Sequence, residues 1–404
     1  MMFATVLCWA LPMSYTGAYL QLYMADQGLS KLAIGTLASA QMAAQIVGAL
    51  LGGWLAERWG FRRTLLTFDW LTYIVMFAFY IAGGGYFPFL AGSLAIGLVS
   101  LVMPAWTGLF VASVPPSRRA QAFSLQAMGF LLGQVLVSPA GLLVARLGLG
   151  TASRIMFVFG MVSISLGVWI RSRYLRDPFP PQGGKGMSLA TVETIARGHW
   201  TSLRAMLRRR VLARLFVIQV LLTAVAAIWA TYVNLYLVDP RGIGLPPAVI
   251  AIFPLLAGIV TVLVTFFVMP HVNRGGLSGF LILSNGLMML NVHLLLLAPR
   301  GALGVVAGAA VVGAAGWALF QPALNARWVN AMGDRERPHI LSLANALVML
   351  FTVPIPTLAG ALYEIHPRGP LLLALLIQGV MLALLAFNAS REAGGGLTGR
   401  GAVR

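Results

Sequence analysis

The sequence predicts an all-α membrane protein in which twelve transmembrane helices form two pseudo-symmetric six-helix bundles. Three observations predict this fold class. The 404 residues are 59% hydrophobic and 9% charged, a composition typical of bilayer-spanning proteins and not of water-soluble domains. Apolar stretches of about 20 residues, the length that a spanning helix needs, recur along the whole chain. The second half of the chain also repeats residues of the first at a fixed offset.

The apolar stretches are separated by short clusters of Gly, Pro and Arg. Several contain proline, as at Pro104, Pro139 and Pro322, which bundled membrane helices tolerate because neighbouring helices satisfy the freed backbone groups. The expected spans are 2–25, 31–57, 63–83, 86–113, 121–145, 152–173, 211–237, 247–270, 277–298, 302–328, 339–363 and 369–388.

These spans predict four parts of the chain. We expect an N-terminal six-helix bundle over 1–175, a central cytoplasmic loop over 176–210, a C-terminal bundle over 211–388 and a disordered, Gly-rich cytoplasmic tail over 389–404. Apolar residues between Leu189 and Leu207 recur near helical spacing opposite arginines. This pattern indicates either an amphipathic helix on the inner leaflet or a solvated linker that is helical only in part.

The formal charge of +18 raises the question of nucleic-acid binding, and the placement of the basic residues answers it. One set of predicted loops holds most of the 28 Lys and Arg residues; the other holds Lys31, Arg146, Arg154, Arg241, Arg300 and Arg368. The positive-inside rule therefore places the basic side, with both termini, in the cytoplasm, and the chain in the plasma membrane. No compact basic face with interleaved aromatic residues remains, so we expect no nucleic-acid partner.

An internal repeat relates the two predicted bundles. At an offset of 218 residues, a proline, an arginine and a serine recur in the same order. The matched residues are Pro104 with Pro322, Arg119 with Arg337 and Ser124 with Ser342. This offset aligns the fourth and fifth spans with the tenth and eleventh, as a six-plus-six duplication requires.

A short charged turn between the second and third spans carries the most specific motif. Its residues are Gly53, Leu55, Ala56, Glu57, Arg58, Gly60, Arg62 and Arg63. With this turn and its six-plus-six organisation, the chain resembles transporters of the major facilitator superfamily over essentially its whole length. That family carries Gly-x-Leu-Ala-Asp-Arg-x-Gly and then basic residues at this turn, so this chain has Glu57 in place of the usual Asp and Phe61 in place of the first basic residue.

The resemblance implies that Glu57 meets the start of the eleventh helix, near Pro338. A carboxylate is stabilised by the dipole at a helix N-terminus. We expect a conformational latch that holds the cytoplasmic sides together in the outward-open state, formed by Gly53, Glu57, Arg58, Gly60, Arg62, Arg63 and Arg337. The alternative is that these arginines serve only as topology anchors.

In the family fold the first, fourth, seventh and tenth helices line a central cavity, and their polar content here is aromatic and amide. The expected cavity residues are Tyr15, Tyr19, Trp106, Trp229, Tyr232, Asn234, Gln321 and Asn325. Tyr15 and Tyr19, and likewise Gln321 and Asn325, are four residues apart and so share a helix face. For each residue alone, the alternative is anchoring at the lipid interface or helix packing.

Asp69 is the acidic residue expected to lie clearly within a span. A carboxylate inside a membrane is costly and marks proton pathways, so Asp69 is the candidate for proton coupling. The alternative is a structural ion pair, for which Arg62, Arg63 and Arg118 are the nearest candidates.

The sequence contains no phosphate-binding Gly-Lys loop, no cluster of metal-ligating residues and no nucleophile with a base at motif spacing. We expect a monomeric secondary transporter and not an enzyme, with neither cofactor nor metal, which works by alternating access. The expected activity is multidrug-type export of amphipathic or hydrophobic molecules by antiport, with protons and membrane lipids as further partners. Two alternatives are uptake of a neutral polar solute such as a sugar, and a non-transporting receptor or scaffold.

Overall fold

The computed structural model describes residues 2–175, 177, 208–272, 277–332 and 337–398. Within these ranges the chain is helical and contains no strand. Eleven helical segments of the described chain are long and apolar enough to cross a membrane. A twelfth long helix, α1 (Met2–Asp26), carries Tyr15, Thr16 and Tyr19 in its second half. The predicted all-α membrane fold is confirmed.

The first half of the molecule contains six spans, two of which are interrupted. A 3-10 turn divides the fourth span just before Pro104, and the fifth is broken beside Pro139, because a proline cannot donate the hydrogen bond that a continuous helix requires. The spans are α1, α2 (Lys31–Trp59), α3 (Phe61–Ala82), α4 (Tyr86–Gly97) with η1 (Leu98–Leu101) and α5 (Met103–Ala112), α6 (Arg119–Leu136) with α7 (Ala140–Leu147), and α8 (Leu149–Tyr174). A short turn, η2 (Pro116–Arg118), precedes α6.

The second half repeats this arrangement with its own interruptions. Counted along the whole chain, the eighth span contains a π-helical turn. The eleventh span is divided at Val353, just before Pro354. The spans are α10 (Arg210–Val238), η3 (Pro247–Ala251) with α11 (Ile252–Leu263), η4 (Val264–Val268) and α12 (Met269–Val272), then α13 (Leu277–Leu297), α14 (Leu303–Asn330), α15 (Arg337–Thr352) with α16 (Pro354–Ile365), and α17 (Gly369–Thr398).

The C-terminal tail expected to be disordered from residue 389 requires a correction. The last helix, α17, continues to Thr398. Extending an existing helix adds one hydrogen bond for each residue fixed, without a new nucleation cost, so the Gly-rich sequence does not end the helix at the membrane surface. The amphipathic segment expected within 189–207 lies outside the described residues.

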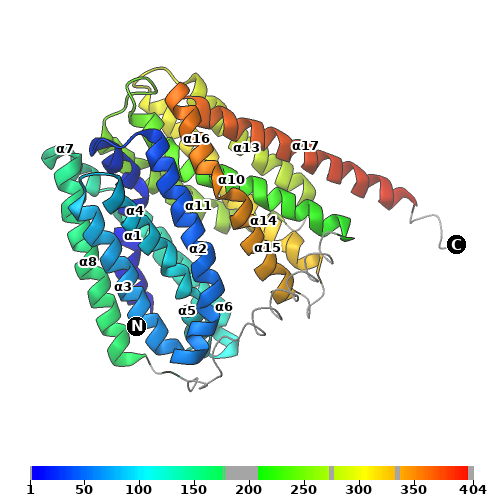
Figure 1. Ribbon diagram of the computed structural model, residues 1–404. Helices are drawn as coiled ribbons and strands as arrows, with labels where there is room; N and C mark the ends of the chain where they lie inside the picture. The colour runs from blue at the N-terminus through cyan, green and yellow to red at the C-terminus, as the bar shows by residue number, and fades with distance from the viewer. Residues whose placement is uncertain (1, 176, 178–207, 273–276, 333–336, 399–404) are drawn as a thin grey trace.

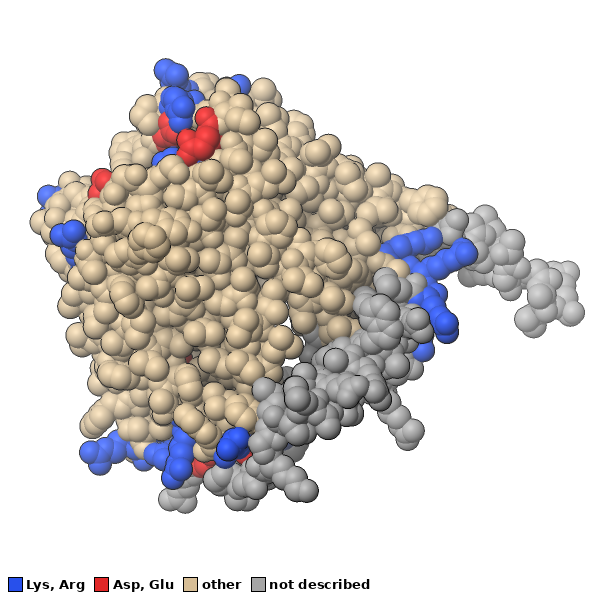
Figure 2. All heavy atoms as spheres, viewed as in Figure 1, with Lys and Arg blue, Asp and Glu red and all other residues tan. Residues whose placement is uncertain are grey.

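On the face shown in Figure 2, the charged residues lie at the top, at the bottom and at the right-hand edge, with an uncharged region between them. One end carries the α2–α3 turn with Arg58, Arg62 and Arg63; we call it the basic end. The opposite end carries Lys31 and Glu364; we call it the closed end. Figure 1 shows the two halves side by side at the closed end and diverging toward the basic end.

The closed end is held by close packing of α2 on α16. Gly35 and Gly360 permit this approach, because a side chain at either position would collide with backbone of the facing helix. The Tyr232 hydroxyl donates to the carbonyl oxygen of Pro356 at 2.8 Å and lies 3.1 Å from that of Lys31. The closed end is therefore sealed by direct contacts between the two halves.

A carboxylate from one half also caps a helix of the other. Glu364 Oε1 accepts hydrogen bonds from the backbone N–H groups of Lys31, at 2.6 Å, and Leu32, at 3.2 Å. These groups lie in the first turn of α2, where the helix has no internal acceptors for them and the dipole favours negative charge. The α2–α16 contact is thus electrostatic as well as steric.

Candidate functional site

A central cavity lies where the two halves meet. It consists of two adjoining spaces of about 350 and 540 Å³, which share Gly17, Asn234 and Pro254 as lining residues. The smaller space extends among α10, α11, α13 and α14, and the larger lies between α1, α6 and the second half. A cavity at the interface of two repeats, near mid-membrane, is where secondary transporters bind substrate.

The lining combines aromatic rings with uncharged hydrogen-bonding groups. Trp229 and Trp317 face the smaller space together with Thr261 and Asn291, whereas Ser14 and Gln134 face the larger. None of the described lining residues is charged. The cavity can therefore offer apolar surface and neutral hydrogen bonds.

Two asparagines give the cavity its polarity. Asn234 Nδ2 donates to the Ala18 carbonyl oxygen at 3.0 Å, which joins α10 to α1 across the two halves. Asn291 is buried, and its Oδ1 accepts no hydrogen bond from any described residue. A buried acceptor without a donor costs free energy, so a ligand N–H or O–H would be stabilised there.

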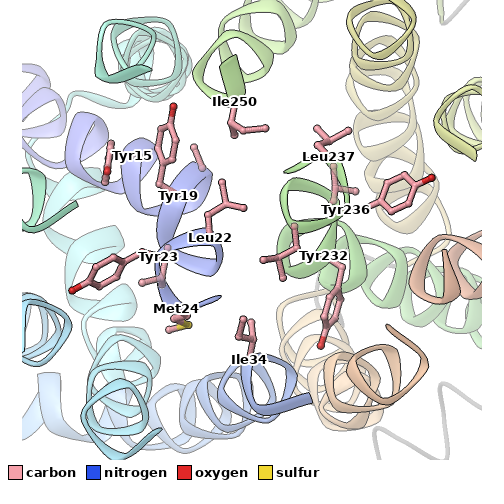
Figure 3. Close-up of a cluster of buried hydrophobic side chains, with 14 of the residues drawn as sticks. Tyr15, Tyr19, Leu22, Tyr23, Met24, Ile34, Tyr232, Tyr236, Leu237 and Ile250 are labelled. Carbon is pink, nitrogen blue, oxygen red and sulfur yellow. The ribbon is translucent and has the colours of Figure 1, made fainter. Parts of the chain in front are cut away.

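The sequence placed Trp229 and Asn234 at the cavity, and the structure brings both into its lining. Tyr15 and Tyr19 lie elsewhere: they are fully buried, their rings stack at 4.8 Å, and the Tyr15 hydroxyl is 2.9 Å from Ser153 Oγ. Figure 3 shows Tyr15 on the face of α1 that is turned away from α10. On α1 it is the neighbouring face, with Ser14 and Gly17, that lines the cavity.

The other expected cavity residues are also positioned by their helix faces. Tyr232 points toward α16, where it binds the closed-end backbone (Figure 3). Gln321 and Asn325 bond to each other at 3.2 Å on the part of α14 nearer the basic end, and they are not among the residues lining the central cavity. Trp106 lies within the first half, with its ring centroid 4.6 Å from the central carbon of the Arg171 guanidinium group.

Sequence reasoning missed Ser14, Gly17, Gln134 and Asn291 as lining residues. Gln134 and Asn291 carried a usable signal, because an amide inside an otherwise apolar span is unusual and functional roles are common for such residues. Gly17 carried none, since a small residue on a membrane helix equally indicates close helix packing.

Asp69 forms a buried ion pair, but not with the arginines expected. Its partner is Arg171 of α8, and both side chains are 8% exposed. The helices α3 and α8 pack against each other, which places Asp69, two turns into α3, opposite the last turns of α8. Arg62 instead binds the end of α8: its backbone N–H donates to Asp177 Oδ2 at 2.9 Å and its guanidinium to the Ser172 carbonyl oxygen.

Comparison with known proteins identifies the family. The profile of the Major Facilitator Superfamily matches residues 1–353. The chain belongs to the Major Facilitator Superfamily. Among curated proteins, the probable galactarate/D-glucarate transporter GudP of Bacillus subtilis (strain 168) is 28% identical over 256 residues, which are 58% of this chain and 55% of GudP. The chain thus spans about half the length of this curated relative.

Solved structures of two transporters share the fold. The nucleoside transporter NupG superposes with a TM-score of 0.72 at 15% identity, covering 96% of this chain and 98% of NupG. A peptide transporter POT superposes with a TM-score of 0.75 at 16% identity, covering 96% of this chain and 92% of the other. At these identities the similarity establishes the fold alone.

The superfamily motif of the α2–α3 turn takes a well-defined shape. Gly60 has φ of +89°, a conformation that L side chains rarely adopt, and it turns the chain between α2 and α3. Glu57 is exposed, and no hydrogen bond or ion pair joins it to another described residue. A Cβ at Gly53 would meet nothing within 4 Å. The side chain of Arg337, the expected latch partner, lies outside what the structure describes.

Proposed function

We propose that this chain is a secondary transporter that exports an uncharged, amphipathic small molecule. The observation that carries the proposal is the central cavity between the halves, where indole rings and neutral amide and hydroxyl groups line about 350 and 540 Å³ of space and no charged residue is among the described lining. Amphipathic compounds enter cells by crossing the bilayer unaided, so a protein is needed mainly to move them outward.

The lining argues against a doubly charged substrate. GudP is named as a galactarate/D-glucarate transporter, and both of these compounds are dicarboxylates. A site that holds a carboxylate in a low-dielectric cavity needs a cationic partner, typically arginine. Arg171 lies instead inside the first half, already paired with Asp69. We therefore assign this chain a neutral cargo.

The contacts at the closed end support alternating access as the mechanism. In the described conformation α2 and α16 seal that end, and the halves diverge at the basic end, which the positive-inside rule assigns to the cytoplasm. For the cavity to open outward, the bonds of Glu364 and Tyr232 to Lys31 must break. We propose that the Glu57 motif then closes the basic end, as Glu364 closes the other end here.

A neutral polar solute such as a sugar is the second candidate. The observation that favours it is the combination of Trp229 and Trp317 with three amide side chains, Asn234, Asn291 and Gln134, in the cavity lining. Rings of this kind stack on the apolar face of a sugar, and amides bind its hydroxyl groups. Ligand binding distinguishes this candidate from the first.

The experiment is a thermal-stability comparison with three ligands, at pH 5.5 and 7.5. Chloramphenicol represents uncharged amphiphiles, glucose neutral sugars and galactarate dianions. Ligands that bind only the folded protein raise its melting temperature. We expect chloramphenicol alone to raise it. A shift with glucose alone would favour the second candidate, and a shift with galactarate alone would overturn the proposed neutral cargo.

A further inference from the structure

A separate cavity of about 180 Å³ lies within the first half; we call it the side pocket. It is lined by residues of α1, α3, α6 and α8 and of the stretch where the 3-10 turn η1 meets α5. Trp9 and Phe130 line both the side pocket and the central cavity. Their rings lie edge to face with centroids 5.3 Å apart, so they form part of the wall between the two spaces.

The side pocket is mostly apolar. Val6, Val99 and Val102 contribute aliphatic surface, and its polar lining includes the Gln126 amide and the Asp69–Arg171 ion pair. The guanidinium of Arg171 also lies over the Trp106 ring, with 4.6 Å between its central carbon and the ring centroid. Because the two charges of the pair cancel, the pocket does not favour an ionic ligand.

Two buried polar atoms of the lining lack hydrogen-bond partners among the described residues. They are Arg171 Nε, a donor, and Gln126 Oε1, an acceptor. Arg171 as a whole is 7% exposed. Unsatisfied buried polar groups are rare and costly, so their presence beside a cavity indicates an occupant that can donate and accept.

The size of the pocket limits that occupant. A cavity of about 150 Å³ lined by aliphatic and aromatic side chains can hold one benzene molecule. The side pocket, at about 180 Å³, has room for one six-membered ring with a small substituent. An empty apolar cavity lowers stability in proportion to its volume, which favours a filled state.

We propose that the side pocket binds one single-ring molecule of the phenol class. The ring lies among the valines and the Trp106 ring, and the hydroxyl group bonds to Arg171 Nε or Gln126 Oε1. This site is distinct from the central cavity, and the proposal does not depend on which cargo the central cavity carries.

The test measures phenol binding to the full chain in lipid nanodiscs by equilibrium dialysis, with empty nanodiscs subtracted. Val99→Phe fills the side pocket, and Ala310→Phe, which narrows only the central cavity, is the matched control. We expect one phenol per chain, a loss of affinity of at least tenfold in the Val99 variant and a change of less than twofold in the Ala310 variant. Absence of saturable binding to the unmodified chain would overturn the proposal, as would loss of binding only in the Ala310 variant.

Photolabelling of the unmodified chain tests the same claim without relying on a variant that folds. After illumination with 4-azidophenol, we expect labelled peptides that contain residues 99–106, which line the side pocket and not the central cavity. Labels confined to α10, α11, α13 and α14 would place the phenol in the central cavity and contradict the proposal.

Discussion

Asn234 has two roles at the residue scale. Its Nδ2 group bonds to the Ala18 carbonyl across the two halves, and its side chain lines both spaces of the central cavity. A residue in this position can sense whether the cavity is occupied and transmit that to the contact between α1 and α10. It is therefore our first candidate for coupling substrate binding to movement of the halves.

We expect Asn234→Ala to weaken substrate binding by about three- to tenfold, because a single neutral hydrogen bond contributes about 0.5–1.5 kcal/mol. Thr231→Ala is the matched control: Thr231 lies one turn earlier on α10 and bonds to its own helix, at Ala227. Chloramphenicol titrations monitored by melting temperature measure both. Equal losses in the two variants would show a general effect on α10 and would remove Asn234 from the site.

The Asp69–Arg171 pair gives a prediction that separates stability from proton coupling. Asp69→Asn leaves a buried guanidinium without its counter-ion, which destabilises a protein by about 3–5 kcal/mol. The double variant Asp69→Asn/Arg171→Leu should recover most of this stability, since no charge remains. Thermal unfolding of the three proteins measures the effect. A single variant as stable as the wild type would contradict the ion pair.

The same double variant tests whether Asp69, the sequence's candidate for proton coupling, carries protons. If the carboxyl group of Asp69 takes up the coupled proton, a pH gradient no longer accelerates transport by the double variant. The double variant still exchanges substrate across the membrane when no pH gradient is present. Retention of the full pH-gradient effect would assign Asp69 a structural role only.

The sequence could identify some of the site residues and not others, for reasons of helix rotation. Trp229 and Asn234 were predicted as cavity residues and line the cavity, whereas Tyr15 and Tyr19 were predicted with them and are buried, with Tyr15 against α8 and Tyr19 stacked on Tyr15. Successive residues of an α-helix point about 100° apart. Knowing which helix a residue belongs to therefore does not tell which face of that helix it lies on. Only the packing of α1 on its neighbours determines that Gly17 faces the cavity.

At the scale of elements, the contact between α2 and α16 defines the described conformation. Two glycines allow the helices to approach, and one carboxylate caps α2 from the other half. Ser39 Oγ and Thr357 Oγ1, 2.8 Å apart, add a hydrogen bond farther along the same contact. Because these contacts join different halves, all of them must be released when the closed end opens.

We expect Gly360→Val to disfavour the closed end, because its Cβ would lie against the Lys31 carbonyl and the Leu32 Cα. Overpacking of this kind costs about 1–3 kcal/mol, which corresponds to at least a fivefold change in the population ratio. Spin labels at Phe87 and Leu297, which are both 78% exposed, report the separation of the halves at this end. Gly286→Ala, where a Cβ meets nothing within 4 Å, is the control. An unchanged distance distribution in the Gly360 variant would refute this role of the contact.

Elements were largely predictable from the sequence, because a bilayer imposes both the length and the apolar character of each span. The predicted spans 31–57 and 211–237 agree within two residues with α2 and α10. The exceptions are local: a 3-10 turn interrupts the fourth span, a π-helical turn the eighth, and α17 runs ten residues past its predicted end at 388. These features depend on neighbouring helices and on continued propagation, which hydrophobicity along the chain does not encode.

At the scale of the whole molecule, two carboxylates near opposite ends make the proposed transport cycle testable. Glu364 caps α2 at the closed end, and we propose that Glu57 acts on the start of α15 at the basic end. Loss of a charge at a helix N-terminus changes the free energy by about 0.3–1 kcal/mol. On this proposal each end forms, when it is closed, a weak and reversible electrostatic contact that substrate binding can overcome.

We expect Glu364→Gln and Glu57→Gln to shift the conformational equilibrium in opposite directions, each by about two- to fivefold. Labels at Phe87 and Leu297 report the closed end, and labels at Tyr174 and Val211, both exposed, report the basic end. Glu364→Gln should lengthen the distance between the labels at Phe87 and Leu297. Glu57→Gln should reduce the population of molecules in which the labels at Tyr174 and Val211 are close together. Asp26→Asn, an exposed carboxylate at the closed end, is the control. Shifts of the same sign in both glutamate variants would exclude this pair of opposing contacts.

The most direct test of the central claim is flux through the purified chain in proteoliposomes. Vesicles are loaded with chloramphenicol, glucose or galactarate, and exchange with external labelled compound is followed for the wild type and for Ala310→Trp, which fills the central cavity. The predicted result is exchange of chloramphenicol only, abolished in the Ala310 variant and retained in the cavity-distant variant Gly286→Ala. Exchange of galactarate but not chloramphenicol, or chloramphenicol exchange that the filled cavity leaves unchanged, would contradict transport of a neutral amphiphile through this site.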